Sequence, residues 1–272
     1  SWAVRSVNSS EHCRMLVLAS GSSGNCIFIQ AGKANILVDA GISCSRIEYG
    51  LSVIGINPQD LDAIFISHEH SDHIAGLLVF EKRYNKKIIA TEGTLNGIKN
   101  IDEISDYCDI ISINQFSEKS IKGVRISTFK LDHDALEPIG LNIVNRGFKI
   151  SIATDLGYVS DDVFKHLKKS NLIVLESNYD EKMLLDGGYP WFLKNRITGK
   201  NGHLSNEDFT HALLELNWEG LTHVYAAHIS RENNTNRKVS ANYKAKFKNA
   251  KHIPALNLTR HDCPCQCFMN YK

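Results

Sequence analysis

The chain has 272 residues, of which 43% are hydrophobic and 22% are charged, and its formal net charge is +1. This length is enough for a sizeable core, in one large domain or two small ones. The near-neutral balance excludes binding of nucleic acid through global charge, so such a partner would need a local basic surface. The longest apolar runs are only as long as strands, and we therefore expect no membrane span.

The first third of the chain contains short β-rich runs separated by glycine and serine. The predicted strands here are 15–20, 26–31, 34–40 and 61–67. The turns GSSGN and GK between the first three strands predict an antiparallel meander. Apolar residues recur at helical spacing over 44–55, and Asn57-Pro58 ends this helix. A second helix is expected over 74–85.

The rest of the chain mixes strand and helix patterns. The predicted strands are 87–91, 109–113, 123–131, 139–145, 148–154, 171–177 and 222–230. The predicted helices are 161–170, 205–217 and 238–249. Ser205 and Asp208 resemble a capping box at the start of the second of these helices. Strands first, followed by mixed strands and helices, indicate an α/β protein with sheets packed face to face and helices outside.

The two ends of the chain differ from the part between them. Residues 1–14 contain no apolar stretch of signal-peptide length, and we expect them to be a leader outside the fold. A single domain then covers 15–260, and 261–272 form a cysteine-rich tail. The tail sequence CPCQC lacks the C-x-x-C spacing of structural zinc sites. Seven cysteines without a regular framework indicate a reducing compartment, so we expect a cytoplasmic protein.

A cluster of ligand-type residues follows the predicted strand 61–67. His68, His70, Asp72 and His73 form the pattern H-x-H-x-D-H. This is not the H-E-x-x-H pattern of helical zinc proteases, because the fourth residue after His68 is an aspartate. Neutral imidazoles and a carboxylate are good ligands for divalent metal ions. Such a cluster packs poorly without a metal, so the sequence predicts a metal site here.

A two-metal site needs more ligands than this loop supplies. His133, Asp155 and His228 each directly follow a predicted strand. Loops at strand ends place functional side chains on a rigid frame. We therefore expect these three residues to join the cluster.

The order of these motifs resembles that of the metallo-β-lactamase fold superfamily, whose fold is a four-layer αββα sandwich. The resemblance implies two divalent ions, Zn²⁺ or Mn²⁺. The first ion would be held by His68, His70 and His133, and the second by Asp72, His73 and His228. Asp155 would bridge the two ions. Asp39 matches a structural aspartate of the superfamily that makes hydrogen bonds near the site.

A narrower resemblance points to a nuclease. The stretches VLASGSSGNCIFIQ, ISHEHSDHIAGL, TDLGYVS and AHISRENNT are similar to the YycJ/WalJ group, which are bacterial-type DNA exonucleases. The likeness extends from about Met15 to Val239. It implies a metal-dependent phosphodiesterase in which a hydroxide shared by the ions, oriented by Asp72, is the nucleophile. The implied partner is a nucleic acid, DNA in preference to RNA.

Two residues outside the ligand set resemble a proton-donating pair. Glu176 and His203 correspond in position to a Glu–His pair in related tRNA-3′-processing nucleases. A histidine polarised by a carboxylate can protonate the leaving oxygen of a phosphodiester. The alternative is that Glu176 is an ordinary strand-end carboxylate and His203 caps the next helix.

Residues near the last ligand are candidates for binding the substrate backbone. The donors that follow the last ligand are Ser230, Arg231, Asn233 and Asn234. The two asparagines could equally shape a turn. Three basic residues before His203 could line the approach, although such charges are usually solvated. They are Lys194, Arg196 and Lys200.

Three other functions remain open. The first is RNA processing of the tRNA 3′-end type, but the chain has no Gly/Pro-rich arm of the kind those nucleases carry. The second is hydrolysis of a small substrate such as a lactam, lactone or thioester, which would not need Glu176 and His203. The third is a binding protein that keeps the fold without a metal, although all seven ligand positions hold ligand-type residues.

Overall fold

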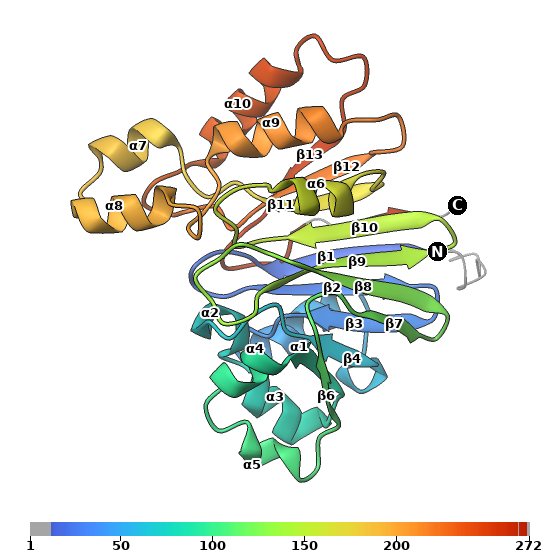
Figure 1. Cartoon of the computed structure of the whole chain (residues 1–272). Helices are drawn as coiled ribbons and strands as arrows, with labels where there is room; N and C mark the ends of the chain where they lie inside the picture. Colours follow the sequence, from blue (N-terminus) through green and yellow to red (C-terminus); the bar gives the residue numbers. More distant parts are fainter. Residues whose placement is uncertain (1–11, 266, 271–272) are drawn as a thin grey trace.

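The central feature of the computed structural model, which describes residues 12–265 and 267–270, is a pair of seven-stranded β-sheets (Figure 1). In the first sheet the strand order is β14-β1-β2-β3-β4-β5-β6. Its strands are β1 (Cys13–Ala19), β2 (Cys26–Ala31), β3 (Ala34–Val38), β4 (Ala63–Phe65), β5 (Ile88–Thr91), β6 (Ile110–Ile113) and β14 (Phe268–Asn270). In the second sheet the order is β13-β12-β11-β10-β9-β8-β7. Its strands are β7 (Glu118–Ile121), β8 (Val124–Lys130), β9 (Ile139–Asn145), β10 (Phe148–Ala153), β11 (Leu172–Glu176), β12 (His223–Ala227) and β13 (Ala255–Leu258).

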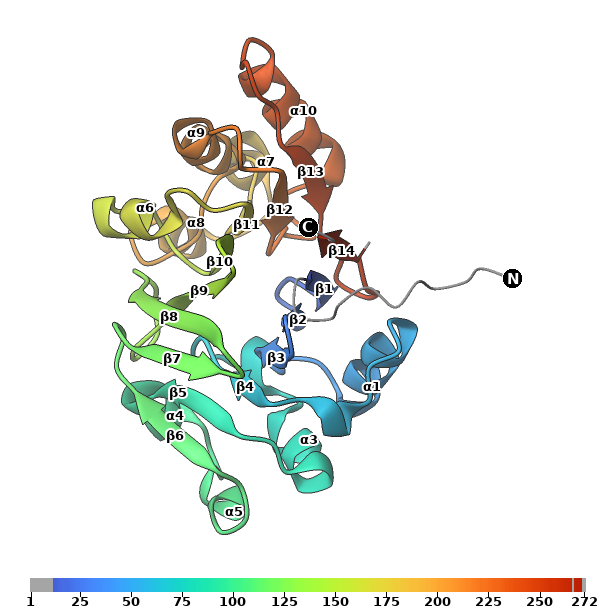
Figure 2. The same ribbon diagram turned by 90° about the vertical axis from the view of Figure 1, so that its right-hand side faces the viewer.

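Helices cover the outer face of each sheet (Figures 1 and 2). Those of the first half are α1 (Cys44–Val53), α2 (Ser71–Ile74), α3 (Leu77–Tyr84), α4 (Glu92–Gly97) and α5 (Asp102–Ser105), with a 3₁₀ turn at Pro58–Asp60. Those of the second half are α6 (Asp161–Leu167), α7 (Glu181–Asp186), α8 (Trp191–Thr198), α9 (Asn206–Leu216) and α10 (Asn236–Phe247). The result is the four-layer αββα sandwich that the sequence predicts.

The core has three parts because each sheet is buried on both faces. On β1, Met15 and Val17 belong to the cluster between the sheets, whereas Leu16 and Leu18 belong to the cluster under the helices of the first half. A third cluster packs the second sheet against α6, α9 and α10. Side chains alternate between the two faces of a strand, so a strand buried on both faces has a continuous apolar sequence.

The predicted meander is confirmed, and the sequence missed several short elements. Strands β1, β2 and β3 pair antiparallel, and β3 to β6 then pair in parallel. The elements that the sequence did not indicate are α2, α4, α5, α7, α8, β7, β13 and β14. Each is at most eight residues long, too short to show a clear period.

The fold extends further at both ends than the expected 15–260. Strand β1 begins at Cys13, inside the expected leader, and the tail returns as β14 to pair antiparallel with it. This pairing covers what would otherwise be an open edge of the first sheet. The rest of the expected leader, residues 1–11, lies outside the described residues. None of the described helices is long and apolar enough to cross a membrane.

Candidate metal centre

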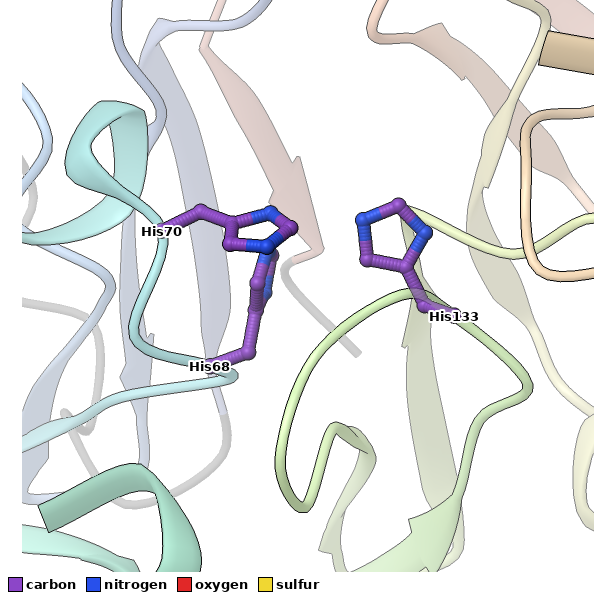
Figure 3. Close-up of side chains that lie close together, drawn as sticks. All are labelled: His68, His70 and His133. Carbon is purple, nitrogen blue, oxygen red and sulfur yellow. The ribbon is translucent and has the colours of Figure 1, made fainter. Parts of the chain in front are cut away.

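The seven ligand candidates from the sequence converge at one edge of the two sheets. Ligand atoms of His68, His70 and His133 lie within 4.8 Å of one another. The same limit holds for a second group, Asp72, His73 and His228, and for a third, His68, His73 and Asp155. Figure 3 shows His68 and His70 on the loop after β4 and His133 facing them from the loop after β8.

The candidate ligands after β4 come from two kinds of backbone, an extended stretch and a helical turn. His68 and His70 precede α2, whereas Asp72 and His73 lie within this one-turn helix. Backbone hydrogen bonds hold the turn, from Ala40 N to the carbonyl of His73 and from Gly76 N to that of Ala40, each of 2.8 Å. The change from extended chain to helix turns Asp72 and His73 toward a different point than His68 and His70.

The contact between this turn and the loop after β3 depends on a glycine. A Cβ atom at Gly41 would lie 1.7 Å from the carbonyl oxygen of Asp72. Only glycine allows the two backbones to approach so closely. This approach fixes the position of the Asp72 backbone.

Buried hydrogen bonds fix the rings of the first-half histidines. Nδ1 of His73 lies 2.7 Å from Oδ2 of Asp39. The Ser67 hydroxyl donates to the same oxygen at 2.8 Å, and Nδ1 of His68 lies 3.0 Å from that hydroxyl. Because the hydroxyl has a single proton, it accepts from Nδ1–H of His68. Both histidines therefore keep Nε2 available for the centre, as metal-binding histidines require.

The second half supplies its ligands one at a time from strand ends. His133 follows β8, Asp155 follows β10 and His228 follows β12. Asp155 and His228 have left-handed backbones with φ of 63° and 53°. Such values are uncommon for residues other than glycine, and they cluster at functional sites.

The two histidines of the second half are oriented in the same manner as those of the first. Nδ1 of His133 donates to the carbonyl of Gly202 at 3.2 Å. Nδ1 of His228 lies 3.1 Å from Oε1 of Glu176. Nε2 of His228 then lies 3.4 Å from both Asp72 Oδ2 and Asp155 Oδ1. The free ring nitrogens of both halves thus face a shared centre.

The protonation states and unpaired atoms of this centre fit divalent cations. Nε2 of His68 is buried and has no hydrogen-bond partner among the described residues. Burial, with the neighbouring His73, holds the pKa of His68 well below its usual range, so the ring is neutral and able to bind a metal. Burial opposes ionisation of Asp155, but the surrounding histidines outweigh it and hold its pKa well below the ordinary value. Burial lowers the pKa of His73 and His228, but the carboxylates beside them outweigh it and raise the pKa of both rings well above the usual value, so a metal ion that binds there would displace their protons. A carboxylate among imidazoles suits Zn²⁺ and Mn²⁺ alike.

Glu176 and His203 form a second unit beside the ligands. Nδ1 of His203 lies 2.6 Å from Oε1 of Glu176, which is fully buried, while 22% of the His203 side chain is exposed. Burial lowers the pKa of His203, but the Glu176 carboxylate outweighs it and raises the pKa above its usual value. The remaining ring nitrogen of His203 is Nε2, and the ring lines the cavity at the centre.

The cavity beside the centre has a volume of about 310 Å³. Its walls include the candidate ligands His70, Asp72, His133, Asp155 and His228, together with His203. Two of the four expected backbone-binding residues, Ser230 and Asn233, also line it. The other two do not. Arg231 pairs with Asp262 at 2.7 Å, and the buried Asn234 amide donates to the carbonyls of Ser177 and Asn178, so it stabilises the fold.

Reasoning from the sequence missed the residues that orient the ligands. Asn25 donates to Asp72 Oδ2 at 3.1 Å, and Asn178 Nδ2 lies 2.8 Å from the carbonyl of His228. Ser67 and Gly202 were also missed, and all four are small polar or glycine residues of common type. Only the position of Ser67, directly before the cluster, could have drawn attention to it.

Comparison with known proteins agrees with this geometry. Residues 34–229 match the model of a family described as a β-lactamase superfamily domain. The chain is 37% identical over 220 residues to the exodeoxyribonuclease YycJ of Bacillus anthracis, covering 80% of this chain and 83% of the relative. It is 36% identical over 224 residues to the exodeoxyribonuclease WalJ of Streptococcus pneumoniae, covering 80% and 82%.

Solved structures of low sequence identity share the fold. The metallo-β-lactamase fold protein YhfI from Bacillus subtilis superposes with a TM-score of 0.72 at 15% identity, covering 96% of this chain and 100% of that one. The short form of human tRNase Z superposes with a TM-score of 0.62 at 15% identity, covering 93% and 98%. With two mixed sheets, seven converging ligand-type residues and relatives of this identity, the chain belongs to the β-lactamase superfamily of hydrolases and, within it, to the YycJ/WalJ exodeoxyribonuclease group.

Proposed function

We propose that this protein is a metal-dependent DNA exonuclease that uses His203 as its proton donor. The observation that carries the proposal is the His203 ring, which is held by Glu176 at 2.6 Å and lines the same cavity as the ligand-type residues. The name of the relatives, exodeoxyribonuclease, supports DNA as the substrate. Seven cysteines without a regular spacing support a reducing compartment such as the cytoplasm.

The ligand-type residues would hold two divalent ions, Zn²⁺ or Mn²⁺. One would be held by His68, His70 and His133 and the other by Asp72, His73 and His228, the groups whose ligand atoms converge. Asp155 lies between the groups, with its carboxylate 3.1 Å from His73 and 3.9 Å from His133. When bound, such ions lower the pKa of a water from about 15.7 toward about 7 and neutralise charge on phosphoryl oxygens.

The protein's own groups then orient the attack and protonate the leaving group. Asp72 lines the cavity and 21% of its side chain is exposed, so it can accept a hydrogen bond from the attacking water. His203 donates Nδ1–H to Glu176, which leaves Nε2 to carry the proton for the leaving oxygen. As the phosphorus–oxygen bond breaks, that proton neutralises the leaving O3′ or O5′. Ser230 and Asn233 line the cavity, where they would donate to a backbone phosphate.

The test compares three substrates with the wild-type protein and two histidine variants. End-labelled duplex DNA is expected to be degraded from its end, whereas a tRNA precursor and the lactam nitrocefin are not turned over. His203→Ala should lower kcat by about 10²- to 10⁴-fold, the usual contribution of a general acid, without loss of bound metal. The matched control is His211→Ala, an exposed histidine on α9 paired with Glu215, which should leave kcat unchanged.

Other outcomes would replace the proposal. Faster processing of the tRNA precursor than of DNA would make the protein an RNA nuclease. Nitrocefin hydrolysis that survives His203→Ala would make it a small-substrate hydrolase, because such chemistry does not need this proton donor.

A further inference from the structure

Helices α7 and α8 carry apolar side chains that the fold does not bury. Figure 1 shows the pair standing out from the body of the molecule beside the second sheet. We call residues 181–198 the arm. Trp191 is 68% exposed, Phe192 is 73% exposed and Leu185 is 57% exposed. All eight residues of α8 are described, four of them are large and apolar, and none is buried. Neighbouring apolar side chains left in water indicate a binding surface.

The arm is continuous with the candidate metal centre. Leu193, Arg196 and Ile197 of α8 line the cavity that also contains His203 and the ligands. Phe192 precedes Arg196 by one helical turn, so the two side chains are neighbours on the helix surface. A bound polymer that leaves the cavity along α8 would therefore meet the exposed rings of Trp191 and Phe192.

The charge near the cavity end of the arm favours an anionic partner. The two acidic residues of the arm, Glu181 and Asp186, are on α7, whereas the stretch from 187 to 203 contains Lys194, Arg196 and Lys200 and no aspartate or glutamate. Arg196 pairs with Asp134 at 2.7 Å, but 64% and 57% of the two side chains are exposed. Ion pairs this exposed contribute little to stability, so the guanidinium can exchange its carboxylate for a phosphate at small cost.

We propose that the arm binds the single-stranded end of the DNA substrate, with bases stacked on Trp191 and Phe192. Lys194, Arg196 and Lys200 hold the DNA backbone between the rings and the cavity. Every base has a π-face, so stacking on aromatic rings binds single strands without regard to sequence, and a basic groove follows the phosphates. A protein partner would need a larger apolar surface than three side chains offer. The inference rests on the proposed function, because that function identifies DNA as the substrate that enters the cavity.

The experiment measures binding apart from cleavage. The probe is a fluorescein-labelled, phosphorothioate-linked oligonucleotide of about twelve thymidines, which resists hydrolysis, and the readout is fluorescence anisotropy with the metal-loaded protein. Trp191→Ala and Phe192→Ala should each weaken binding by about tenfold, the usual effect of losing one stacked base. Trp191→Phe keeps a ring and should restore most of the affinity. The matched control is Tyr49→Ala, an aromatic residue 64% exposed on α1, which should bind as the wild type does.

Several results would overturn the inference. If Trp191→Ala and Phe192→Ala bind the oligonucleotide as tightly as wild type, the arm does not hold the strand. If the wild-type protein sediments as a dimer that Trp191→Ala dissociates, the arm is a surface between copies of the chain. Circular dichroism melting separates either result from unfolding. Since the probe is not cleaved, tight binding that depends on the rings would stand even if the proposed nuclease activity failed.

Discussion

The two halves of the chain build the same centre by different means. The first half places four ligand-type residues between His68 and His73, on one loop after β4. The second half places single residues after β8, β10 and β12, which are separated along the chain and brought together only by the sheet. A local cluster can be recognised from the sequence directly, whereas a dispersed set can be recognised only when the order of the strands in the sheet is known.

Each half nevertheless contains the same supporting device, a buried carboxylate behind a ligand histidine. Asp39 holds His73 at 2.7 Å, and Glu176 holds His228 at 3.1 Å. The difference is that Glu176 also holds His203, at 2.6 Å. In the first half the carboxylate thus fixes one candidate ligand, whereas in the second half one carboxylate fixes a candidate ligand and the proposed proton donor.

The largest effect is expected at Asp155, where the two halves meet. Asp155→Ala removes the carboxylate that lies 3.9 Å from His133 of the first group and 3.1 Å from His73 of the second, so both ion positions would lose a ligand. We expect bound metal, measured by elemental analysis, to fall and DNA hydrolysis to drop to background. Asp109→Ala, an exposed aspartate paired with Lys87, is the control and should keep both. If Asp155→Ala retained its full metal content, the two halves of the centre would bind metal independently of this carboxylate.

A smaller effect separates the two supporting carboxylates. Asp39→Asn and Glu176→Gln should each weaken metal binding by about 10- to 100-fold, because each removes the charge that orients a ligand histidine. Titration with excess metal should then restore kcat in Asp39→Asn. It should not restore kcat in Glu176→Gln, because His203 has lost its partner there.

The measurement is kcat as a function of free metal concentration for both variants and the wild type. Full recovery of Glu176→Gln at saturating metal would mean that the contact with His203 has no part in catalysis. Asp39 and Glu176 would then have the same role, which is to orient one histidine each.

The sequence predicted the residues that belong to local motifs, and it missed the residues whose role depends on tertiary packing. The loop His68–His73 and the strand-end positions of Asp155 and His228 could be recognised because ligand-type residues follow apolar runs. Asn234 was grouped with possible phosphate donors, yet its amide is used inside the fold, which no spacing could reveal. The small orienting residues, such as Asn25, gave no signal because their type is common and their partners are distant in the chain.

Glu81, a buried carboxylate away from the candidate metal centre, shows what Asp155 would experience without its histidines. Glu81 on α3 is fully buried and accepts hydrogen bonds from Lys86 N at 2.6 Å and from the thiol of Cys108 at 3.3 Å. Its Oε1 has no hydrogen-bond partner among the described residues. Burial raises the pKa of Glu81 to about 7, whereas the histidines hold the pKa of Asp155 low. Partners, more than depth, decide the charge of a buried carboxylate.

The smallest effect follows from this contrast and concerns stability alone. Because the pKa of Glu81 is higher in the folded chain than in the unfolded one, its contribution is fully present below about pH 4.5 and is lost as the pH rises through about 7. Glu81→Gln has no ionising group, so from about pH 5 to about pH 7 it should gain about 2 kcal/mol in free energy of unfolding relative to wild type. Urea unfolding of the metal-free proteins at both pH values measures this gain, with the exposed Glu103→Gln as control. A constant difference between Glu81→Gln and wild type at the two pH values would mean that Glu81 stays ionised in the fold, and that carboxylates in this protein tolerate burial without a histidine.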